Sequence, residues 1–323
     1  MDSGIKDPIF GSDTPLVFSH RGGAGEAPES TEEAFRHSVE NAGVDVLELD
    51  IQVTKDGEII VWHGPGLDIV HDGRRFLKGR DIREELFYQD LKDRAWVIHP
   101  NHLNDLEQKP TRRLLTLSDF IALVNQIEDE SNDTGNPKKT HLNIELKKGH
   151  HMEKEWTAVW DRLFEPLDAE TGKRRIVLAS AEHKILESLR NEMARPGRKT
   201  YVTNLSINEQ LSFRRFMPSG MASLFFKAFA PFIYKPEEPA QRPYAFETYF
   251  KLASKTLAEK VREDQSGLYL FLTGIFLFPS VDNRDDTRLK KIIGHLVDAG
   301  VDGIMTDYPA KVVQILREMG IRE

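Results

Sequence analysis

The stretch "VDVLELDIQVT" (residues 44–54) decides the fold class, because it is a long β-branched run with two acidic residues in its middle. Side chains alternate between the two faces of a β-strand, so Glu48 and Asp50 lie on one face. Similar short runs recur along the chain, and helical patterns lie between most of them, at 15–20, 57–63, 141–147, 174–180, 198–204, 267–281 and 301–309. Strands that alternate with helices predict a parallel sheet, and about eight of them favour a closed TIM (β/α)8 barrel.

The domain organisation follows from length and loop size. A barrel of about 250 residues with insertions fits the 323 residues of the chain. Two segments, about 64–140 and 205–262, are longer than ordinary βα loops, and no internal repeat or low-complexity linker separates them. We therefore expect a single domain over 1–323, with a core at about 16–317 and two insertions.

Composition excludes several classes of function. A formal charge of −8 and a pI near 5.8 argue against a protein that binds nucleic acid, and the absence of cysteine excludes disulfides and thiolate sites. The first residues are polar and acidic, unlike a signal peptide, and the longest apolar run (267–281) is too short to span a membrane. We expect a cytoplasmic or peripheral-membrane protein.

Polar motifs stand at the ends of the predicted strands. They read "SHRGG" (19–23), "ELD" (48–50), "WHG" (62–64), "IELK" (144–147) and "TDYP" (306–309). In a barrel the carboxyl ends of the strands face the active-site mouth. One such motif is usually an ordinary surface or core feature, but a succession of them predicts an active site.

The carboxylates among these residues predict a metal site. Glu48 and Asp50 repel each other when buried on one face, unless a cation lies between them. Glu145 occupies the matching position of "NIELK". Three oxygen ligands without cysteine suit Mg²⁺ or Ca²⁺ rather than zinc. Lys147 shares the face of Glu145, so it either contacts an anionic substrate or pairs with a carboxylate.

The remaining motifs predict chemistry on a phosphate. Arg21 is suited to bidentate binding of a phosphate group. His20 and His63 supply the two imidazoles that a general base and a general acid require for attack on a phosphodiester.

Taken together, these motifs resemble the glycerophosphodiester phosphodiesterases. The resemblance runs from about 16 to 317, is weakest in the two insertions, and is carried by "HRGGAGEAPESTEEAF", "GVDVLELDIQVTKDGEIIVWH", "LNIELK" and "GVDGIMTDYP". It implies a TIM barrel with a divalent metal, in which one histidine deprotonates the nucleophile and the other protonates the leaving alcohol. The roles it implies are catalysis for His20 and His63, phosphate binding for Arg21 and Lys147, metal binding for Glu48, Asp50 and Glu145, and support of the site for Glu29 of "PEST".

Three positions depart from the family pattern. Gly64 follows His63 where the family usually has Asp, Ser30 of "PEST" stands where the family has Asn, and Phe276 and Phe278 stand near the position of a family Trp. Loss of an orienting partner commonly lowers activity rather than stability. His71, which precedes Asp72, is a tempting alternative to His63, but the spacing from "TKDG" favours His63.

The substrate class is suggested by the segment "SLFFKAFAPFIYKP" (223–236). It is similar to an apolar element of the lysophospholipase D branch, and its phenylalanines form one helix face. This face predicts either an ordinary core helix or a lipid-facing lip, with peripheral membrane contact through 222–234.

Three functions remain open. The favoured one is a metal-dependent phosphodiesterase that acts on small-molecule glycerophosphodiesters, with lysophospholipids as substrates of choice. The others are a sphingomyelinase D-like phosphodiesterase and a lipid or phosphodiester binder with weakened catalysis. The retained histidine pair favours an enzyme.

Overall fold

The computed structural model describes residues 14–64, 66–71, 74–92, 113–133, 135, 139–147, 156–206, 245–249, 255–256, 258–259, 269–275 and 286–323. The Phe-rich segment 222–234, together with Phe276 and Phe278, lies outside these residues. Among the described residues, no helix has the length and apolar character needed to cross a membrane.

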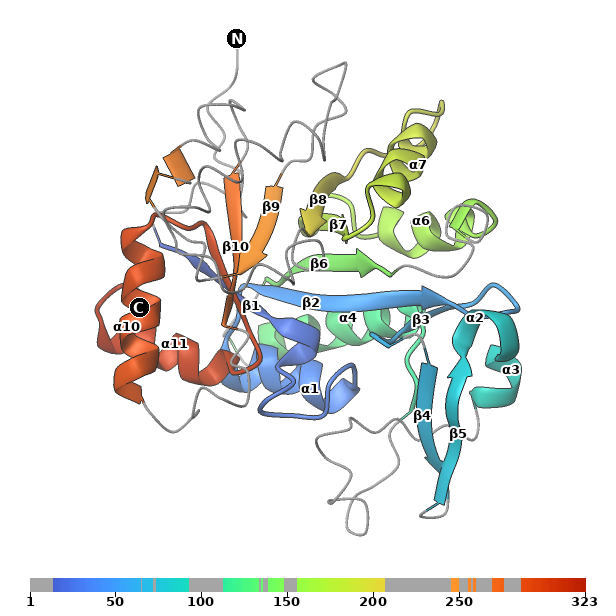
Figure 1. The fold of residues 1–323 in the computed structure, drawn as a ribbon, viewed down its shortest axis with the longest axis horizontal. Helices are drawn as coiled ribbons and strands as arrows, with labels where there is room; N and C mark the ends of the chain where they lie inside the picture. The colour runs from blue at the N-terminus through green and yellow to red at the C-terminus, as the bar shows by residue number, and fades with distance from the viewer. Residues whose placement is uncertain are drawn as a thin grey trace.

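The described strands form a closed parallel barrel, which confirms the predicted TIM-barrel fold (Figure 1). Neighbouring strands pair in parallel around the ring, and the pairings of β1 with both β2 and β11 close it. The barrel strands are β1 (Leu16–Ser19), β2 (Val46–Val53), β6 (His141–Leu146), β7 (Ile176–Ser180), β8 (Val202–Ser206), β9 (Ala245–Tyr249), β10 (Tyr269–Ile275) and β11 (Gly303–Thr306).

One predicted barrel strand is wrong. Within the run 57–63, β3 (Ile59–Val61) pairs antiparallel with β2 as the second arm of a hairpin. Only a short turn separates the two strands, whereas a parallel crossover needs a dozen or more residues. The barrel position assigned to this run belongs instead to β9, inside the segment 205–262 that the sequence suggested was an insertion.

The predicted insertion after His63 begins with a second hairpin. It consists of β4 (Gly66–His71) and β5 (Arg74–Asp81), and the short helices α2 (Ile82–Glu85) and α3 (Tyr88–Leu91) follow. A small apolar cluster joins these helices to β3, made by Ile60, Trp62, Ile82, Leu86, Leu91 and Leu114. The apolar cluster packs the start of the insertion against the end of β3.

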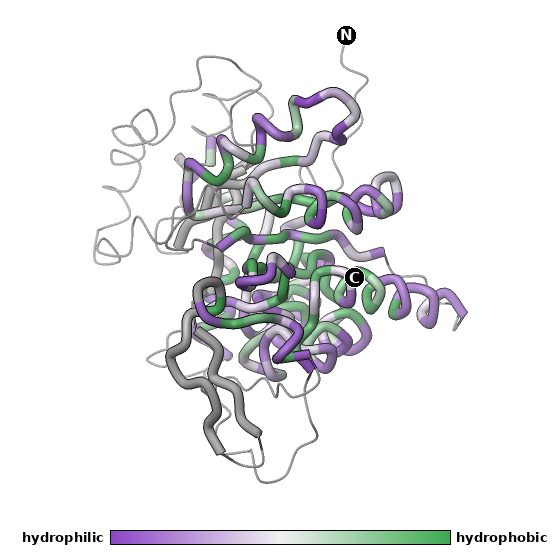
Figure 2. The backbone as a smooth tube through the Cα atoms, turned by 90° about the vertical axis from the view of Figure 1, so that its right-hand side faces the viewer, coloured by the Kyte–Doolittle hydropathy of each residue, from purple (hydrophilic) through white to green (hydrophobic). Residues whose placement is uncertain are grey.

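Among the described residues, helices flank the barrel and cover much of its outer face (Figure 1). They are α1 (Glu32–Arg36) with the turn η2 (His37–Ala42), α4 (Leu117–Asp133), α6 (Trp160–Asp168), α7 (His183–Met193), α10 (Asp286–Asp298) and α11 (Pro309–Glu318). In the hydropathy view, apolar positions gather toward the centre and hydrophilic ones toward the outer helices (Figure 2). The main core therefore lies between strands and helices.

Helix α4 illustrates how sequence sets these elements. Its buried residues recur at spacings of three and four, which gives one apolar face toward the barrel. Thr116 begins the helix, since its hydroxyl accepts a hydrogen bond from the Asp119 amide (3.0 Å) and the Asp119 carboxylate accepts one from the Thr116 amide (3.0 Å). This reciprocal pair is a capping box.

Strand β2 shows why the barrel has two layers. Its outward residues Leu47, Leu49 and Ile51 belong to the core beneath the helices, while Val46 belongs to an inner cluster with Phe18, Val177 and Met305. The alternation leaves Glu48, Asp50 and Gln52 on the inner face, all about 1 % exposed. The apolar inner cluster thus lies deeper inside the barrel than the polar inward residues Glu48, Asp50 and Gln52.

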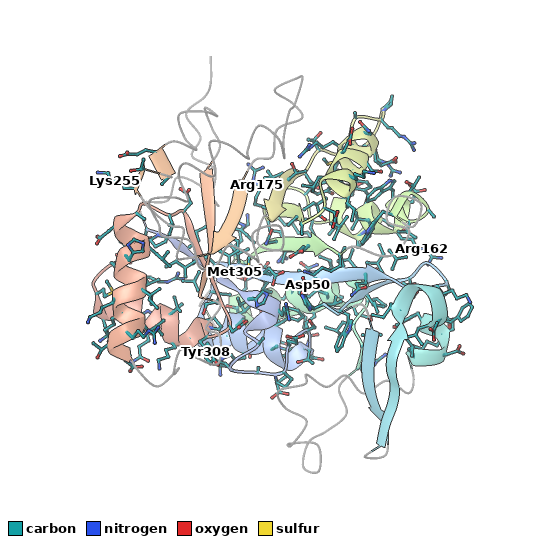
Figure 3. All side chains as sticks on the ribbon, viewed as in Figure 1. Asp50, Arg162, Arg175, Lys255, Met305 and Tyr308 are labelled. Atoms are coloured by element: carbon teal, nitrogen blue, oxygen red, sulfur yellow. The ribbon has the colours of Figure 1, made fainter. Side chains whose placement is uncertain are left out.

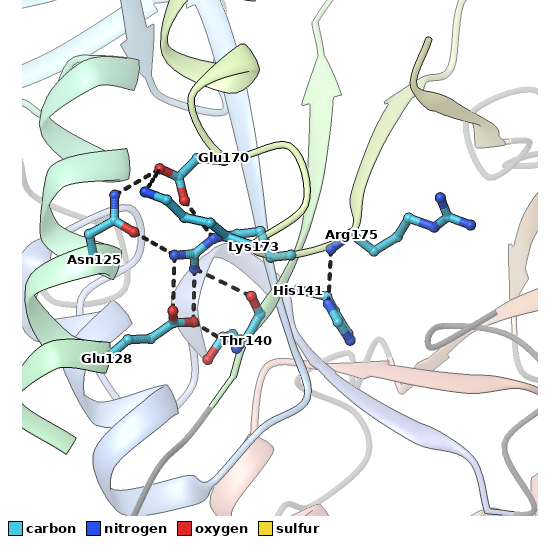
Figure 4. Close-up of polar contacts among 8 residues, drawn as sticks. Asn125, Glu128, Thr140, His141, Glu170, Lys173 and Arg175 are labelled. Carbon is cyan, nitrogen blue, oxygen red and sulfur yellow. Dashed lines mark hydrogen bonds and ion pairs between the residues drawn. The ribbon is translucent and has the colours of Figure 1, made fainter. Parts of the chain in front are cut away.

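A buried ion network joins α4 to the turn before β7 (Figure 4). The Arg174 guanidinium donates hydrogen bonds to Glu170 Oε2 (2.9 Å), Glu128 Oε1 (2.9 Å) and Asn125 Oδ1 (2.6 Å). Its side chain is 1 % exposed, so these partners compensate the cost of burying the charge. Because the network precedes the amino ends of β6 and β7, it stabilises the end of the barrel opposite the mouth.

Candidate active site

Three carboxylates meet on the inner face of the barrel where β2 lies beside β6. The register pairs Asp50 with Glu145 and Glu48 with Asn143. Carboxylate oxygens of Glu48, Asp50 and Glu145 lie within 4.8 Å of one another. Asp50 itself lies near the centre of the molecule on β2 (Figure 3). The structure thus brings together all three residues that the sequence suggested as metal ligands.

Two cations lie against these carboxylates. The Lys147 Nζ atom is 2.8 Å from Glu145 Oε1 and 3.0 Å from Asp50 Oδ1. The Arg21 guanidinium contacts Asp50 Oδ2 through Nε (3.1 Å) and Glu29 Oε2 through NH1 (3.1 Å). Three carboxylates therefore share two cationic side chains, and together with Glu48 the formal charge of this group is negative. Lys147 lies against carboxylates, the second of the two contacts that its position suggested.

The backbone at Arg21 explains the "HRGG" motif. Arg21 has a left-handed backbone (φ 51°), and its amide donates a hydrogen bond to Glu48 Oε2 (2.8 Å). Gly22 also has a positive φ of 79°, and a Cβ there would lie 2.9 Å from the Ala34 Cβ. A larger residue would clash with α1, so glycine permits the tight turn that points the Arg21 amide into the site.

Burial and neighbouring charge set the protonation of the carboxylates. Burial, together with Asp50 and Glu145, raises the pKa of Glu48 well above its ordinary value. Burial also acts to raise the pKa of Asp50, but Lys147 and the other nearby cationic groups outweigh it and hold that pKa below the ordinary value. The pKa values of these two adjacent carboxylates are thus shifted in opposite directions.

This donor set fits a hard divalent cation. All three clustered side chains offer oxygen atoms, which Mg²⁺ and Ca²⁺ prefer. Both Asp50 oxygens are buried and accept no hydrogen bond, although they pair with Arg21 and Lys147. The carboxylates of Glu48, Asp50 and Glu145 are therefore the residues that could hold the ion.

Both predicted catalytic histidines lie at this mouth. His20 follows β1, is 8 % exposed, and its Nδ1 lies 2.6 Å from Asp307 Oδ1. His63 follows β3, which folds back along β2, and the neighbouring Trp62 amide donates to the Asp50 carbonyl (2.9 Å). A hairpin therefore brings His63 to the mouth, and not the end of a barrel strand as the sequence suggested.

The surroundings of His63 keep its imidazole neutral. Burial lowers the pKa of His63 to about 3, and the positive charges of Lys147 and Arg21 act in the same direction, whereas Asp50 opposes them. At neutral pH the ring therefore offers a free nitrogen lone pair that can accept a proton.

Sequence reasoning missed two residues of the site. Gln52 donates hydrogen bonds from Nε2 to the carbonyl oxygens of His63 (2.9 Å) and Gly64. Gln52 could have been identified from the sequence because it stands two residues after Asp50 and so continues the alternating pattern of Glu48 and Asp50. Asp307 stood in the "TDYP" motif, but nothing in the sequence indicated that it contacts His20.

Comparison with known proteins gives a consistent result. The glycerophosphoryl diester phosphodiesterase family matches residues 20–216. The chain is 25% identical to a glycerophosphodiester phosphodiesterase from Caldanaerobacter subterraneus subsp. tengcongensis, over 94% of this chain and 99% of the relative. It is also 25% identical to lysophospholipase D of Homo sapiens, over 92% of this chain and 85% of the relative.

The fold is shared with a solved structure. A phosphodiesterase from Oleispira antarctica, in complex with the product sn-glycerol-3-phosphate, superposes with a TM-score of 0.59 at 16% identity, and the match covers 94% of this chain and 97% of the other.

Proposed function

Because this chain belongs to the glycerophosphoryl diester phosphodiesterase family, we propose that it is a phosphoric diester hydrolase that cleaves glycerophosphodiesters with the help of a divalent cation. The observation that carries the proposal is the clustering of three buried carboxylates beside Arg21, His20 and His63. This set combines a cation site, a guanidinium and two imidazoles, which phosphodiester hydrolysis uses together.

Charge neutralisation falls to the cation site and to Arg21. A divalent cation held by Glu48, Asp50 and Glu145 would supply positive charge beside the phosphate oxygens. Arg21 is fixed by Glu29 and Asp50, so its guanidinium is oriented before substrate arrives. Lys147 neutralises the carboxylates of Asp50 and Glu145, and the family resemblance suggests that it also binds the substrate phosphate.

Proton transfer falls to the two imidazoles. His63, neutral at neutral pH, removes the proton from the attacking hydroxyl, commonly the substrate's own neighbouring glycerol hydroxyl in this family. His20 protonates the oxygen of the departing alcohol. Water then opens the cyclic phosphate, with the roles of the two histidines reversed, and gives the phosphate monoester. The opposite assignment would require a protonated His63, which its buried surroundings disfavour.

Within this class we favour lysophospholipids, so that the reaction is of the lysophospholipase D type. The support is the human lysophospholipase D relative, which aligns over 92% of this chain, and the Phe-rich segment 223–236. The headgroup released would be choline or ethanolamine.

The test compares release of choline from glycerophosphocholine and from lysophosphatidylcholine, with Mg²⁺ or Ca²⁺ and after addition of EDTA. We expect turnover with metal, a higher kcat/KM for the lysophospholipid, and loss of activity with EDTA. His20→Ala should abolish turnover because it removes the proton donor, whereas His71→Ala, the control, should retain it. A protein that binds metal but turns over neither substrate would support the phosphodiester-binding alternative.

A further inference from the structure

Closure of the barrel places the Asp307 carboxylate against Nδ1 of His20. Strands β1 and β11 are neighbours, and their register pairs Ser19 with Thr306. The next residues are His20 and Asp307, so the same closure brings them together across 287 positions of sequence. Their contact joins Nδ1 to Oδ1 at 2.6 Å.

The direction of this hydrogen bond follows from its partners. A carboxylate only accepts hydrogen bonds, so the proton between the two groups lies on the imidazole Nδ1. To act as the proton donor to the departing alcohol, the ring carries a proton on both nitrogens: Nδ1–H donates to Asp307, and Nε2–H is the proton that is transferred. A ring free to rotate or to change tautomer would present the correct nitrogen for only part of the time.

The loop that carries Asp307 is itself fixed to the loop that carries His20. The Gly25 amide donates to the Asp307 carbonyl (2.8 Å), and a Cβ on Gly25 would clash with the Tyr308 ring. The Glu26 carboxylate accepts hydrogen bonds from the amides of Ala310 (3.1 Å) and Lys311 (3.2 Å) at the start of α11. The two loops therefore hold Asp307 at a set distance from His20.

We propose that Asp307 is a positioning residue for the reaction, which binds Nδ1–H of His20, stabilises the doubly protonated ring and directs Nε2–H toward the departing oxygen. The inference rests on the proposed function for the role of His20, but the contact itself does not. Asp307 touches His20 and none of the three clustered carboxylates in any described contact. Its removal should therefore act on proton transfer rather than on metal binding.

The test uses Asp307→Asn, which keeps the shape of the side chain and removes its charge. Asn can donate to Nδ1, which favours a neutral ring that is a much weaker proton donor than the doubly protonated one, so kcat should fall by at least about 100-fold while KM changes by less than about threefold. Asp286→Asn is the matched control, because it removes a carboxylate that is 64% exposed and pairs with Lys311 on α11. The control should keep native kcat.

A second readout does not depend on turnover. Nitrogen NMR of the native protein should show His20 protonated at Nδ1, with the signal identified by its loss in His20→Ala. Asp307→Asn should shift the ring toward the Nε2-protonated form, with melting temperature and bound-metal stoichiometry unchanged.

The results separate the two proposals. Native kcat in Asp307→Asn, or a His20 ring that stays protonated at Nδ1 in this variant, would overturn the positioning role. A fall in kcat accompanied by an equal loss of bound metal would also overturn it, because the effect would then be on the cation site. If the native protein turns over no substrate, the proposed function fails, and the NMR signals alone decide whether Asp307 fixes His20.

Discussion

At the scale of single residues, the mouth of the barrel depends on hydrogen bonds to backbone atoms as well as on charges. Gln52 holds the carbonyls of His63 and Gly64, at the place where the family usually has an Asp after the histidine. The Gln52 side chain is 1% exposed, so packing restricts its alternatives. An amide from β2 thus orients the segment that a neighbouring carboxylate would otherwise help to hold.

Substitution of Gly64 tests this interpretation. If the missing carboxylate limits catalysis, Gly64→Asp should raise turnover. Because Gln52 already fixes the His63 segment, we expect kcat to remain within about threefold of native. Gln52→Ala should lower kcat by about 10- to 100-fold, since it removes that support. A large rise in kcat for Gly64→Asp would contradict the expectation and show that the glycine weakens the enzyme.

At the scale of elements, the starts of β6 and β7 are joined by a half-buried histidine, His141 (Figure 4). His141 Nδ1 accepts a hydrogen bond from the Arg175 amide (3.1 Å), which requires that this nitrogen be unprotonated. Burial lowers the pKa of His141 to about 4, with contributions from Lys139 and Arg174 and opposition from Asp45. The folded protein therefore contains a neutral His141 at neutral pH.

This shift predicts a loss of stability in mild acid. The unfolded chain binds a proton at His141 below about pH 6.5, but the folded chain does so only near pH 4. The unfolded state therefore binds more protons in that window, and the free energy of unfolding falls as pH decreases from 6.5 to 4, by at most about 3 kcal/mol.

Urea unfolding at several pH values checks the prediction. His141→Asn keeps an acceptor for the Arg175 amide and removes the titration, so its stability should fall less between pH 6.5 and 4 than that of the native protein. Equal slopes in the two proteins would show that other groups cause the acid sensitivity.

At the scale of the whole molecule, the carboxylate cluster lowers the free energy of unfolding of the barrel when no cation is bound, and a bound cation raises it. Buried like charges on β2 and β6 repel, and the ion pairs with Lys147 and Arg21 offset only part of this repulsion. A cation that binds the folded state alone raises the free energy of unfolding by about 2.7 kcal/mol at 100 times its dissociation constant.

We therefore expect Mg²⁺ or Ca²⁺ to raise the melting temperature by several degrees, and EDTA to reverse the rise. Glu145→Gln should abolish most of the shift because it removes one of the three clustered carboxylates. Glu165→Gln, an exposed change on α6, is the control and should retain it. An undiminished shift in Glu145→Gln would place the cation elsewhere.

The sequence by itself determined the barrel class and the inward face of β2. Both follow from local periodicity, because alternation along a strand fixes which side chains share a face whatever the rest of the chain does. The same periodicity placed Glu145 on the inner face of β6 and Lys147, directly after the strand, on the same side. These features account for the carboxylate cluster and its ion pairs.

Only the tertiary structure decided which strands complete the barrel and which residues lie beside the two histidines. The run 57–63 has strand character in either arrangement, and pairing with β2 made it a hairpin arm that brings His63 to Asp50. The contact between His20 and Asp307 exists because β11 closes against β1. Such contacts depend on closure of the chain across hundreds of residues, and local propensity carries no information about that step.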